Sequence, residues 1–323
     1  YDGNGNLLWE RRYNGPGNDY DGATSLFVDN QSNVYVTGYS YDSVTDYDYA
    51  TLKYDRQGNL LWERRYNGPG NDYDGAKSLF VDNQGNVYVT GGSYDSLTNF
   101  DYTTLKYDAS GNLLWERRYN GQGNYNDGAT SLFVDNQGNV YVTGRSEGSG
   151  TDYDYATLKY DANGNLLWER RYNGPGNSDD WATSLFVDMN GNVYVTGGSY
   201  DSLTNFDYTT LKYNANGNLL WERRYNGPGN DYDGATSLFV DNQSNVYVTG
   251  HSWGSGTDYD YATIKYIQET PSISEEKENK SEKKLTKKKI YDISGKLVKE
   301  KKLKKGIYFK ETEKGIKKIL ILK

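Results

Sequence analysis

The sequence has no cysteine, one histidine and one methionine among its 323 residues. Without cysteine there are no disulfide bonds, thiol nucleophiles or thiolate metal ligands. The single histidine, His251, leaves at most one imidazole for acid–base catalysis or metal binding. No HExxH motif, phosphate-binding loop or glycine-rich nucleotide fingerprint is present. The sequence therefore gives no support to the enzyme classes that depend on these groups.

Long apolar segments are also missing. No run reaches the roughly 18 residues that a membrane-spanning helix needs, so we expect no membrane span. The chain opens on Tyr1, and its one methionine is Met189. We therefore expect it to be a fragment or a processed product of a longer protein.

Charge is distributed unevenly along the chain. From Ile267 onward there are 18 lysines and 9 acidic residues, which leaves 18 basic and 35 acidic residues in the first 266 positions. Such a difference between segments indicates separate modules. A strongly acidic first segment argues against nucleic acid as a partner, because phosphates require a basic surface.

The chain is dominated by an internal repeat. The heptapeptide Leu-Leu-Trp-Glu-Arg-Arg-Tyr occurs five times, and its first two tryptophans, Trp9 and Trp62, lie 53 residues apart. The same interval separates the later tryptophans, so the repeats span 1–53, 54–106, 107–159, 160–212 and 213–265. A fixed period of this length is typical of solenoids, propellers or arrays.

Each repeat contains four runs of β-branched and aromatic residues between turn signals, which predicts four strands. In the first repeat and the start of the second, the predicted strands are Ala23–Asp29, Asn33–Thr37, Tyr47–Tyr54 and Asn59–Tyr66. Two connections in each repeat are tight, and the other two are predicted to be long; in the second repeat the long ones are Asn67–Gly75 and Gly91–Phe100. In an antiparallel unit, alternate connections lie at opposite ends, so both long loops should emerge on one face.

The tight connections have the pattern Asp-x-x-Gly-Asn, as at Asp82–Asn86. Glycine in this pattern supplies a positive φ angle that closes the hairpin, and Asp can accept hydrogen bonds from the turn backbone. Ser32 and Ser244 replace this glycine in two repeats, where we expect mild strain. The string also suggests a calcium loop, but it lacks the longer ligand run and final glutamate of an EF-hand. We interpret it as a turn.

Repeated four-stranded units of this size predict an all-β fold, a β-propeller of antiparallel blades. The repeat closely resembles the bacterial seven-bladed β-propeller repeat (SBBP). The match is carried by Trp62, Tyr66, Gly68, Gly70, Asp74, Ala76, Ser78, Leu79, Val81, Asp82, Gly85–Gly91 and Thr104–Asp108. The resemblance covers residues 1–266, and it implies a secreted or cell-surface protein, generally without known catalysis.

The resemblance also implies that Ala23–Asp29 is an inner strand and that Leu7–Tyr13 is an outer strand. The last repeat ends on its third strand, so Leu7–Tyr13 is predicted to complete the last blade and to close a ring of five. A truncated larger propeller is the alternative.

The residues after the repeats differ in composition. Residues 267–288 are rich in Glu, Lys and Ser, which predicts a linker. Residues 289–323 show short strand patterns separated by glycine turns, which predicts a small C-terminal β module. This module resembles the type A sorting domain of the type IX secretion system, through Tyr291, Asp292, Gly295, Gly306, Tyr308 and Phe309. The resemblance implies the type IX machinery as a partner and export to the extracellular space or cell surface. The alternative is a basic β module that packs on the acidic repeats.

Differences between the repeats point to a candidate binding face. The aromatic, basic and histidine residues that vary there are Tyr39, Arg145, Trp181, His251 and Trp253. Exposed aromatic rings of this kind stack on sugars or on protein partners, so the candidate ligands are a glycan or a surface protein. We expect His251 itself to be an exposed loop residue.

One aspartate recurs before each inner strand, at Asp21, Asp74, Asp127, Asp180 and Asp233. Such a ring of carboxylates is a candidate calcium site. The alternative, which we favour, is that each aspartate accepts hydrogen bonds from its own loop. No other cofactor is expected.

Taken together, the sequence favours a non-catalytic scaffold or binding module. The alternative is a glycan-active hydrolase or lyase with paired carboxylates, which lie about 5 Å apart in retaining glycosidases. A purely architectural role is a third interpretation. Near-identity between repeats favours the scaffold, because an active site would break the symmetry.

Overall fold

The computed structural model describes residues 1–267 and four short segments, 290–292, 297–298, 306–312 and 315–321. These described residues form an all-β structure without helices. No helix that is suited to crossing a membrane therefore occurs among them. Contacts divide the chain into two compact units, Tyr1–Gln268 and Glu269–Lys323.

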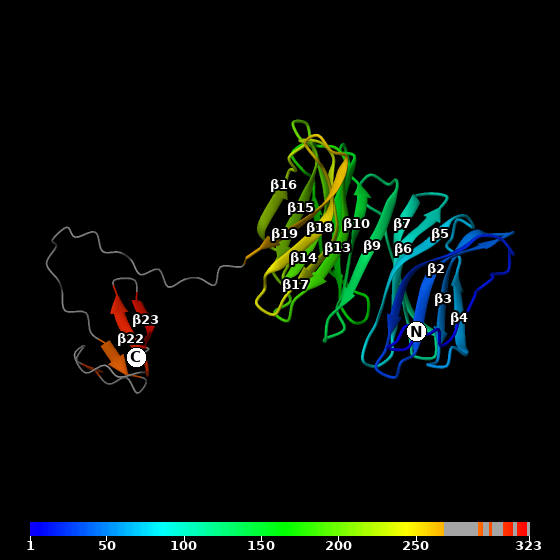
Figure 1. Ribbon diagram of the computed structural model, residues 1–323, viewed down its shortest axis with the longest axis horizontal. Helices are drawn as coiled ribbons and strands as arrows, with labels where there is room; N and C mark the ends of the chain where they lie inside the picture. Colours follow the sequence, from blue (N-terminus) through cyan, green and yellow to red (C-terminus); the bar gives the residue numbers. More distant parts are fainter. Residues whose placement is uncertain (268–289, 293–296, 299–305, 313–314, 322–323) are drawn as a thin grey trace. The chain divides into compact units, whose positions relative to one another are not determined.

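Five antiparallel sheets make up the first unit, and we call them blades 1 to 5 (Figure 1). Blade 1 contains β1 (Asp21–Val28), β2 (Val34–Asp42), β3 (Asp46–Tyr54) and β4 (Leu60–Tyr66). Blade 2 contains β5 (Asp74–Val81), β6 (Val87–Asp95), β7 (Asn99–Tyr107) and β8 (Leu113–Tyr119). Blade 3 contains β9 (Asp127–Val134), β10 (Val140–Glu147), β11 (Tyr153–Tyr160) and β12 (Leu166–Tyr172). Blade 4 contains β13 (Asp180–Val187), β14 (Val193–Asp201), β15 (Asn205–Tyr213) and β16 (Leu219–Tyr225). Blade 5 has three strands, β17 (Asp233–Val240), β18 (Val246–Trp253) and β19 (Tyr259–Tyr266).

The strands are paired in sequence order within each blade, as the repeat pattern predicts. The first strands of successive blades contact one another, so β1, β5, β9, β13 and β17 line the inner edge of the row. The Leu-Leu-Trp-Glu-Arg-Arg-Tyr strands form the outer edge. The second and third strands of the inner blades are buried on both faces, as in β6 and β7, because each of these blades is covered on both faces by its neighbours.

The second strand of each blade is longer than predicted. The prediction of a long loop at Gly91–Phe100 is wrong, because β6 continues to Asp95 and β7 begins at Asn99. Glycine is required inside this strand: a Cβ on Gly91 would lie 2.1 Å from the carbonyl oxygen of Gly75. Asn99 takes a positive φ of 61°, which closes the short turn. Glycine therefore marks a close approach of two strands here, where the sequence pattern suggested a loop.

The tight Asp-x-x-Gly-Asn turns have the predicted geometry. Gly85 has a φ of 81°, and Asp82 accepts hydrogen bonds from the backbone N–H groups of Gln84 and Asn86. Ser32 and Ser244 adopt the same left-handed conformation, with φ angles of 63° and 64°. A residue with a Cβ is strained in this region, so the strain expected at the two serines is present.

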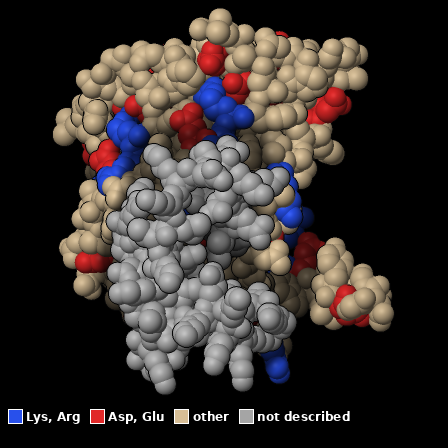
Figure 2. Space-filling model, turned by 90° about the vertical axis from the view of Figure 1, so that its left-hand side faces the viewer, with Lys and Arg blue, Asp and Glu red and all other residues tan. Residues whose placement is uncertain are grey.

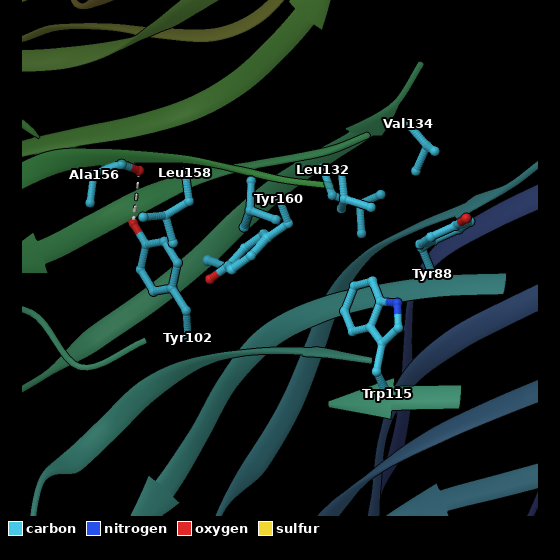
Figure 3. Close-up of a cluster of buried hydrophobic side chains, with 11 residues drawn as sticks. Tyr88, Tyr102, Trp115, Leu132, Val134, Ala156, Leu158 and Tyr160 are labelled. Carbon is cyan, nitrogen blue, oxygen red and sulfur yellow. Dashed lines mark hydrogen bonds between the residues drawn. The ribbon is translucent and has the colours of Figure 1, made fainter. Parts of the chain in front are cut away.

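The cores lie between blades. Each of blades 1 to 4 turns a face with two tyrosines and a tryptophan toward the next blade, and we call this side of a blade the tyrosine face; in blade 2 it holds Tyr88, Tyr102 and Trp115. The opposite, aliphatic face of blade 3 packs against it with residues that include Leu132, Val134 and Leu158 (Figure 3). The Tyr102 hydroxyl donates a hydrogen bond of 3.2 Å to the carbonyl oxygen of Ala156 across this interface. The tyrosines therefore fill the interface and also satisfy its buried polar groups.

The predicted closure of the ring by Leu7–Tyr13 is wrong. Residues 1–20 contain no strand, and β19 has no fourth strand beside it. Instead, the indole of Trp9 donates to the carbonyl oxygen of Arg56, and Nε of Arg11 donates to that of Gly58. These contacts hold the segment against blade 1, whereas β19 lies at the other end of the row (Figure 1).

The second unit contains one sheet in the order β21–β20–β22–β23. Its strands are β20 (Ile290–Asp292), β21 (Leu297–Val298), β22 (Gly306–Thr312) and β23 (Gly315–Ile321). Of the residues that resemble a sorting domain, Tyr291 and Asp292 fall in β20, and Gly306, Tyr308 and Phe309 fall in β22. Gly295 and the predicted linker from residue 268 onward lie outside the described residues.

Candidate functional site

Four positions break the symmetry of the repeats in neighbouring blades. Lys77 in blade 2 stands where the other blades have threonine, and Trp181 in blade 4 stands where they have glycine. Arg145 in blade 3 takes a position that is Tyr, Gly, Gly or His elsewhere. Asn126, just before β9, occupies a position that is Tyr or Asp elsewhere. The sequence spreads these residues over about two repeats, and each one differs from its equivalents in size or charge.

The fold brings these four residues to one pocket. It has a volume of about 470 Å³ and lies along the inner strands of blades 2, 3 and 4. Its lining includes Tyr73, Lys77, Phe100, Asn126, Arg145 and Trp181. Glycines at Gly75, Gly92 and Gly128 also line it and leave space that side chains would fill. The volume of this pocket lies in the size range of ligand sites in proteins. The residues that distinguish it from the equivalent places between other blades are the four that break the repeat symmetry.

The pocket combines two cations with aromatic walls. Lys77 and Arg145 are exposed, and no salt bridge among the described residues includes either of them. The guanidinium carbon of Arg145 lies 4.8 Å from the centre of the Tyr153 ring. This contact orients the guanidinium without neutralising its charge. An arginine held in this way presents its planar donor fork to a carboxylate or sulfate.

Asp127 is the single carboxylic acid among the residues that line the pocket. Its side chain is buried and accepts hydrogen bonds from the backbone N–H groups of Gly121 (2.6 Å) and Glu147 (3.1 Å). Burial raises the pKa of Asp127 to about 6. The carboxylate therefore organises the loop before β9, and its oxygens are already engaged.

The other recurring aspartates make the same local contact. Asp21, Asp74, Asp180 and Asp233 accept a hydrogen bond from the backbone N–H of a glycine six residues earlier: Gly15, Gly68, Gly174 and Gly227. Burial raises the pKa of Asp74 and Asp180 to about 6. Among the described residues, no group of three or more acidic or histidine side chains is arranged to hold a metal ion. The geometry assigns the five aspartates a local role in their loops.

An aromatic row flanks the pocket on both sides. On one side, Tyr39, Tyr73 and Phe100 follow one another with ring centres 6.1 and 6.0 Å apart. On the other side, Trp181 lies 4.4 Å from Phe206 and 6.1 Å from Tyr232.

Further along this row, the ring of His251 stacks on that of Tyr232, with ring centres 5.4 Å apart and an angle of 10° between the ring planes. The prediction of an exposed loop position for His251 is wrong, because the residue is half-buried within β18. Trp253 ends β18 and packs edge-on against Tyr259 at 5.0 Å. His251 and Trp253 belong to the aromatic row outside the pocket.

The structure therefore divides the five candidate binding residues. Arg145 and Trp181 line the pocket, and Tyr39 lies near it, with the Lys77 ammonium 6.0 Å from its ring centre. Sequence reasoning missed Lys77 and Asn126. The signal was available, since each differs from the other four residues at its repeat position, but only the packing of blades shows that they share one pocket with Arg145 and Trp181.

The surface outside the pocket carries both signs of charge. Figure 2 shows Lys and Arg intermixed with Asp and Glu on the described part of one face. Lys77 and Arg145 share their pocket with a single acidic residue, Asp127.

A family model matches part of the chain and supports the fold. Residues 167–203 match the family model of the SBBP beta-propeller repeat. No curated protein matches the chain. A gluconolactonase from Xanthomonas campestris is similar in structure, at 16% identity and a TM-score of 0.40, over 71% of this chain and 69% of that one. An ulvan lyase is similar at 14% identity and a TM-score of 0.45, over 75% of this chain and 68% of that one.

The β-propeller domain of a trilobed protease from Pyrococcus furiosus is similar at 8% identity and a TM-score of 0.44, over 93% of this chain and 84% of that one. At such identities and TM-scores, these likenesses carry no argument about fold or activity. The matched segment 167–203 runs from β12 through β14 and lies within one of five nearly identical repeats. The chain thus contains an SBBP beta-propeller repeat, and its five sheets are propeller-type blades.

Proposed function

We propose that this protein is a non-catalytic binding module that takes an acidic glycan into the pocket between blades 2, 3 and 4. The observation that carries the proposal is the convergence of Lys77, Asn126, Arg145 and Trp181, which break the repeat symmetry, on one pocket. A sugar ring stacks on a tryptophan face, and a uronate or sulfate group pairs with arginine and lysine. Asn126 adds an amide for hydroxyl groups.

The lack of a second reactive group in the pocket supports binding over catalysis. Acid–base cleavage of a glycan needs two positioned groups, and Asp127 is the single acidic or histidine residue among those that line the pocket. Its hydrogen bonds to the loop keep it in place as a structural carboxylate.

A glycan lyase is the second candidate, because the pocket that Lys77 and Arg145 line also contains Asp127, whose pKa is raised by burial to about 6. A lyase requires a base and a cation that neutralises the uronate. In that case Asp127→Asn would abolish formation of an unsaturated uronate, measured by its ultraviolet absorbance. As a binding module, the protein produces no such absorbance with any acidic glycan.

Export to the cell surface is the remaining part of the proposal. It is supported by the resemblance of residues 289–323 to a sorting domain and by the strands at 290–292, 306–312 and 315–321. The type IX machinery is the partner that this implies. In a bacterium that has this machinery, a reporter protein fused to residues 267–323 should reach the culture medium or cell surface. A reporter retained in the cell would argue against export.

The binding test uses reversion to the repeat consensus, which limits effects on the fold. The full chain is titrated with uronate-bearing, sulfated and neutral oligosaccharides by calorimetry. Trp181→Gly restores the residue that the other four blades have, and we expect at least a tenfold loss of affinity. Arg145→Gly restores the residue of blades 2 and 4, and it should remove the preference for acidic over neutral glycans.

His251→Gly is the matched control, because it makes the same change at the equivalent position of blade 5, outside the pocket. It should leave the affinity within about twofold. Unchanged binding in Trp181→Gly and Arg145→Gly, with an unchanged melting temperature, would show that the pocket is not the site.

A further inference from the structure

A single pair of facing residues decides where the pocket opens. The pair lies on the first two strands of each blade, and in blade 2 both members are glycines, Gly75 and Gly92. In every other blade a glycine faces one large side chain. These side chains are Tyr39 in blade 1, Arg145 in blade 3, Trp181 in blade 4 and His251 in blade 5. The same register position is therefore filled differently in each of the five blades.

These side chains leave an opening at blades 2 and 3. A Cβ on Gly22 would lie 2.5 Å from Cζ of Tyr39, so the tyrosine ring fills the place beside its glycine in blade 1. A Cβ on Gly128 would meet no atom within 4 Å, although this glycine faces Arg145. Trp181 lines the pocket from blade 4. The open region thus has a tyrosine in the blade before it and a tryptophan in the blade after it.

The cation of blade 2 replaces a residue that ties neighbouring blades together. In blades 1 and 3, the hydroxyls of Thr24 and Thr130 donate hydrogen bonds of 2.8 Å to the carbonyl oxygens of Ala76 and Ala182 in the next blade. Lys77 takes the equivalent position in blade 2 and has no hydroxyl for this bond. A residue that breaks a structural rule of its fold is expected at a functional site. The lysine is therefore better explained by its charge in the pocket than by packing.

Tyr39 lies on the blade 1 side of the pocket. Its ring centre is 6.1 Å from that of Tyr73, which lines the pocket, and 6.0 Å from the ammonium of Lys77. Along the row, blade 1 thus supplies an aromatic ring, blades 2 and 3 supply one cation each, and blade 4 supplies a second aromatic ring. A sugar ring stacks on an aromatic side chain, and a carboxylate or sulfate pairs with a cation. This order fits a chain with two acidic groups between two stacked sugar rings.

We propose that the pocket binds a stretch of a polyanionic polysaccharide, with successive acidic groups at Lys77 and Arg145 and with sugar rings against Trp181 and Tyr39. The inference rests on the proposed function and names the kind of acidic glycan that the pocket takes. Acidic groups recur along such a chain, so the ligand is a polymer and not a glycan with one terminal acid. Tyr39 becomes a second stacking residue, outside the pocket that Trp181 lines.

The first test is the length of the ligand. The full chain is titrated by calorimetry with di-, tetra- and hexasaccharides of a polyuronate and of a sulfated polysaccharide. In at least one series, the affinity should rise at least tenfold from the disaccharide to the hexasaccharide, because only the longer chains reach both aromatic rings. Equal affinities at all lengths would overturn this inference and leave the proposed function intact. Absence of binding in both series would overturn the proposed function as well.

Tyr39→Gly tests the second stacking residue, since it restores the residue of blades 2 and 4. It should lower the affinity for the hexasaccharide at least tenfold and leave that for the disaccharide within about twofold. Trp181→Gly, in contrast, should weaken the binding of both. Tyr39→Phe keeps the ring and should bind the hexasaccharide within about twofold of the original affinity.

His251→Gly is the matched control, because it makes the same change at the equivalent position of blade 5. It should leave the affinities for both lengths unchanged. If Tyr39→Gly has an unchanged melting temperature and binds the hexasaccharide as before, Tyr39 is no part of the site. An equal loss for both lengths would also contradict the inference, since Tyr39 would then act only by shaping the pocket.

Lys77→Thr tests the second acidic group and restores the residue of the other four blades. The melting temperature should rise, because a hydroxyl is again present for the hydrogen bond between blades 2 and 3. The preference for a polyuronate hexasaccharide over a hexasaccharide with one terminal uronate should fall at least tenfold. A higher melting temperature with an unchanged preference would show that Lys77 binds no acidic group, and it would overturn the inference.

Discussion

Blades 2 to 4 and the two terminal blades have nearly the same sequence but different environments. Tyr102 in blade 2 is buried between two blades and donates to a carbonyl oxygen of blade 3. Tyr261, at the same repeat position in blade 5, is fully exposed. Identical residues therefore contribute differently to stability, because burial in this fold comes from the next blade and not from the strand itself.

The largest difference in stability is expected when each of these two tyrosines is replaced by alanine. Tyr102→Ala leaves a cavity in an interface between blades and should lower the free energy of unfolding by about 3–5 kcal/mol. Tyr261→Ala removes an exposed ring and should change it by less than about 0.5 kcal/mol. Chemical denaturation measures both values. Equal losses in the two variants would mean that β19 is covered.

The opposite end of the row gives a second contrast. Leu79→Ala in blade 2 should lower the free energy of unfolding by about 2–4 kcal/mol, because the leucine is buried against blade 1. Leu26→Ala in blade 1 should have an effect below about 0.5 kcal/mol under the same conditions. A loss for Leu26→Ala as large as for Leu79→Ala would contradict the exposed aliphatic face.

The smallest change in stability is expected at the tight turns. Here it should not matter whether the blade is terminal or interior. Ser32→Gly and Ser244→Gly each relieve a left-handed backbone conformation and should stabilise the protein by about 1 kcal/mol. Gly85→Ser in blade 2 is the reverse change and should destabilise it by a similar amount. Thermal unfolding of the three variants measures this. An effect that differs between terminal and interior blades would show that packing, and not φ alone, sets the strain.

Much of the fold could be predicted from the sequence because local chemistry repeats five times. The third strand of blade 1 was predicted at Tyr47–Tyr54 and observed at Asp46–Tyr54. The turn at Asp82–Asn86 followed from one glycine and one aspartate. The second strand was underestimated, because Gly91 suggested a loop when it marks a close approach of β5 and β6.

The candidate site could be predicted only in part. Arg145 and Trp181 were identified because they differ from their repeat equivalents and are of types that bind ligands. Lys77 and Asn126 differ as well, but their relation to the pocket depends on which blades are neighbours and on where glycines leave space. The sequence does not contain these distances.

The sequence by itself determined the repeat, the strand order within a blade and the turn conformations, because each depends on residues close together in the chain. Tertiary structure decided which face of each blade is buried and that Leu7–Tyr13 rests on blade 1 and not beside β19. It also decided that four unusual residues meet in one pocket. The physical reason is that these properties arise from packing between blades, and nearly identical blades leave the pairing of the two ends undetermined in the sequence.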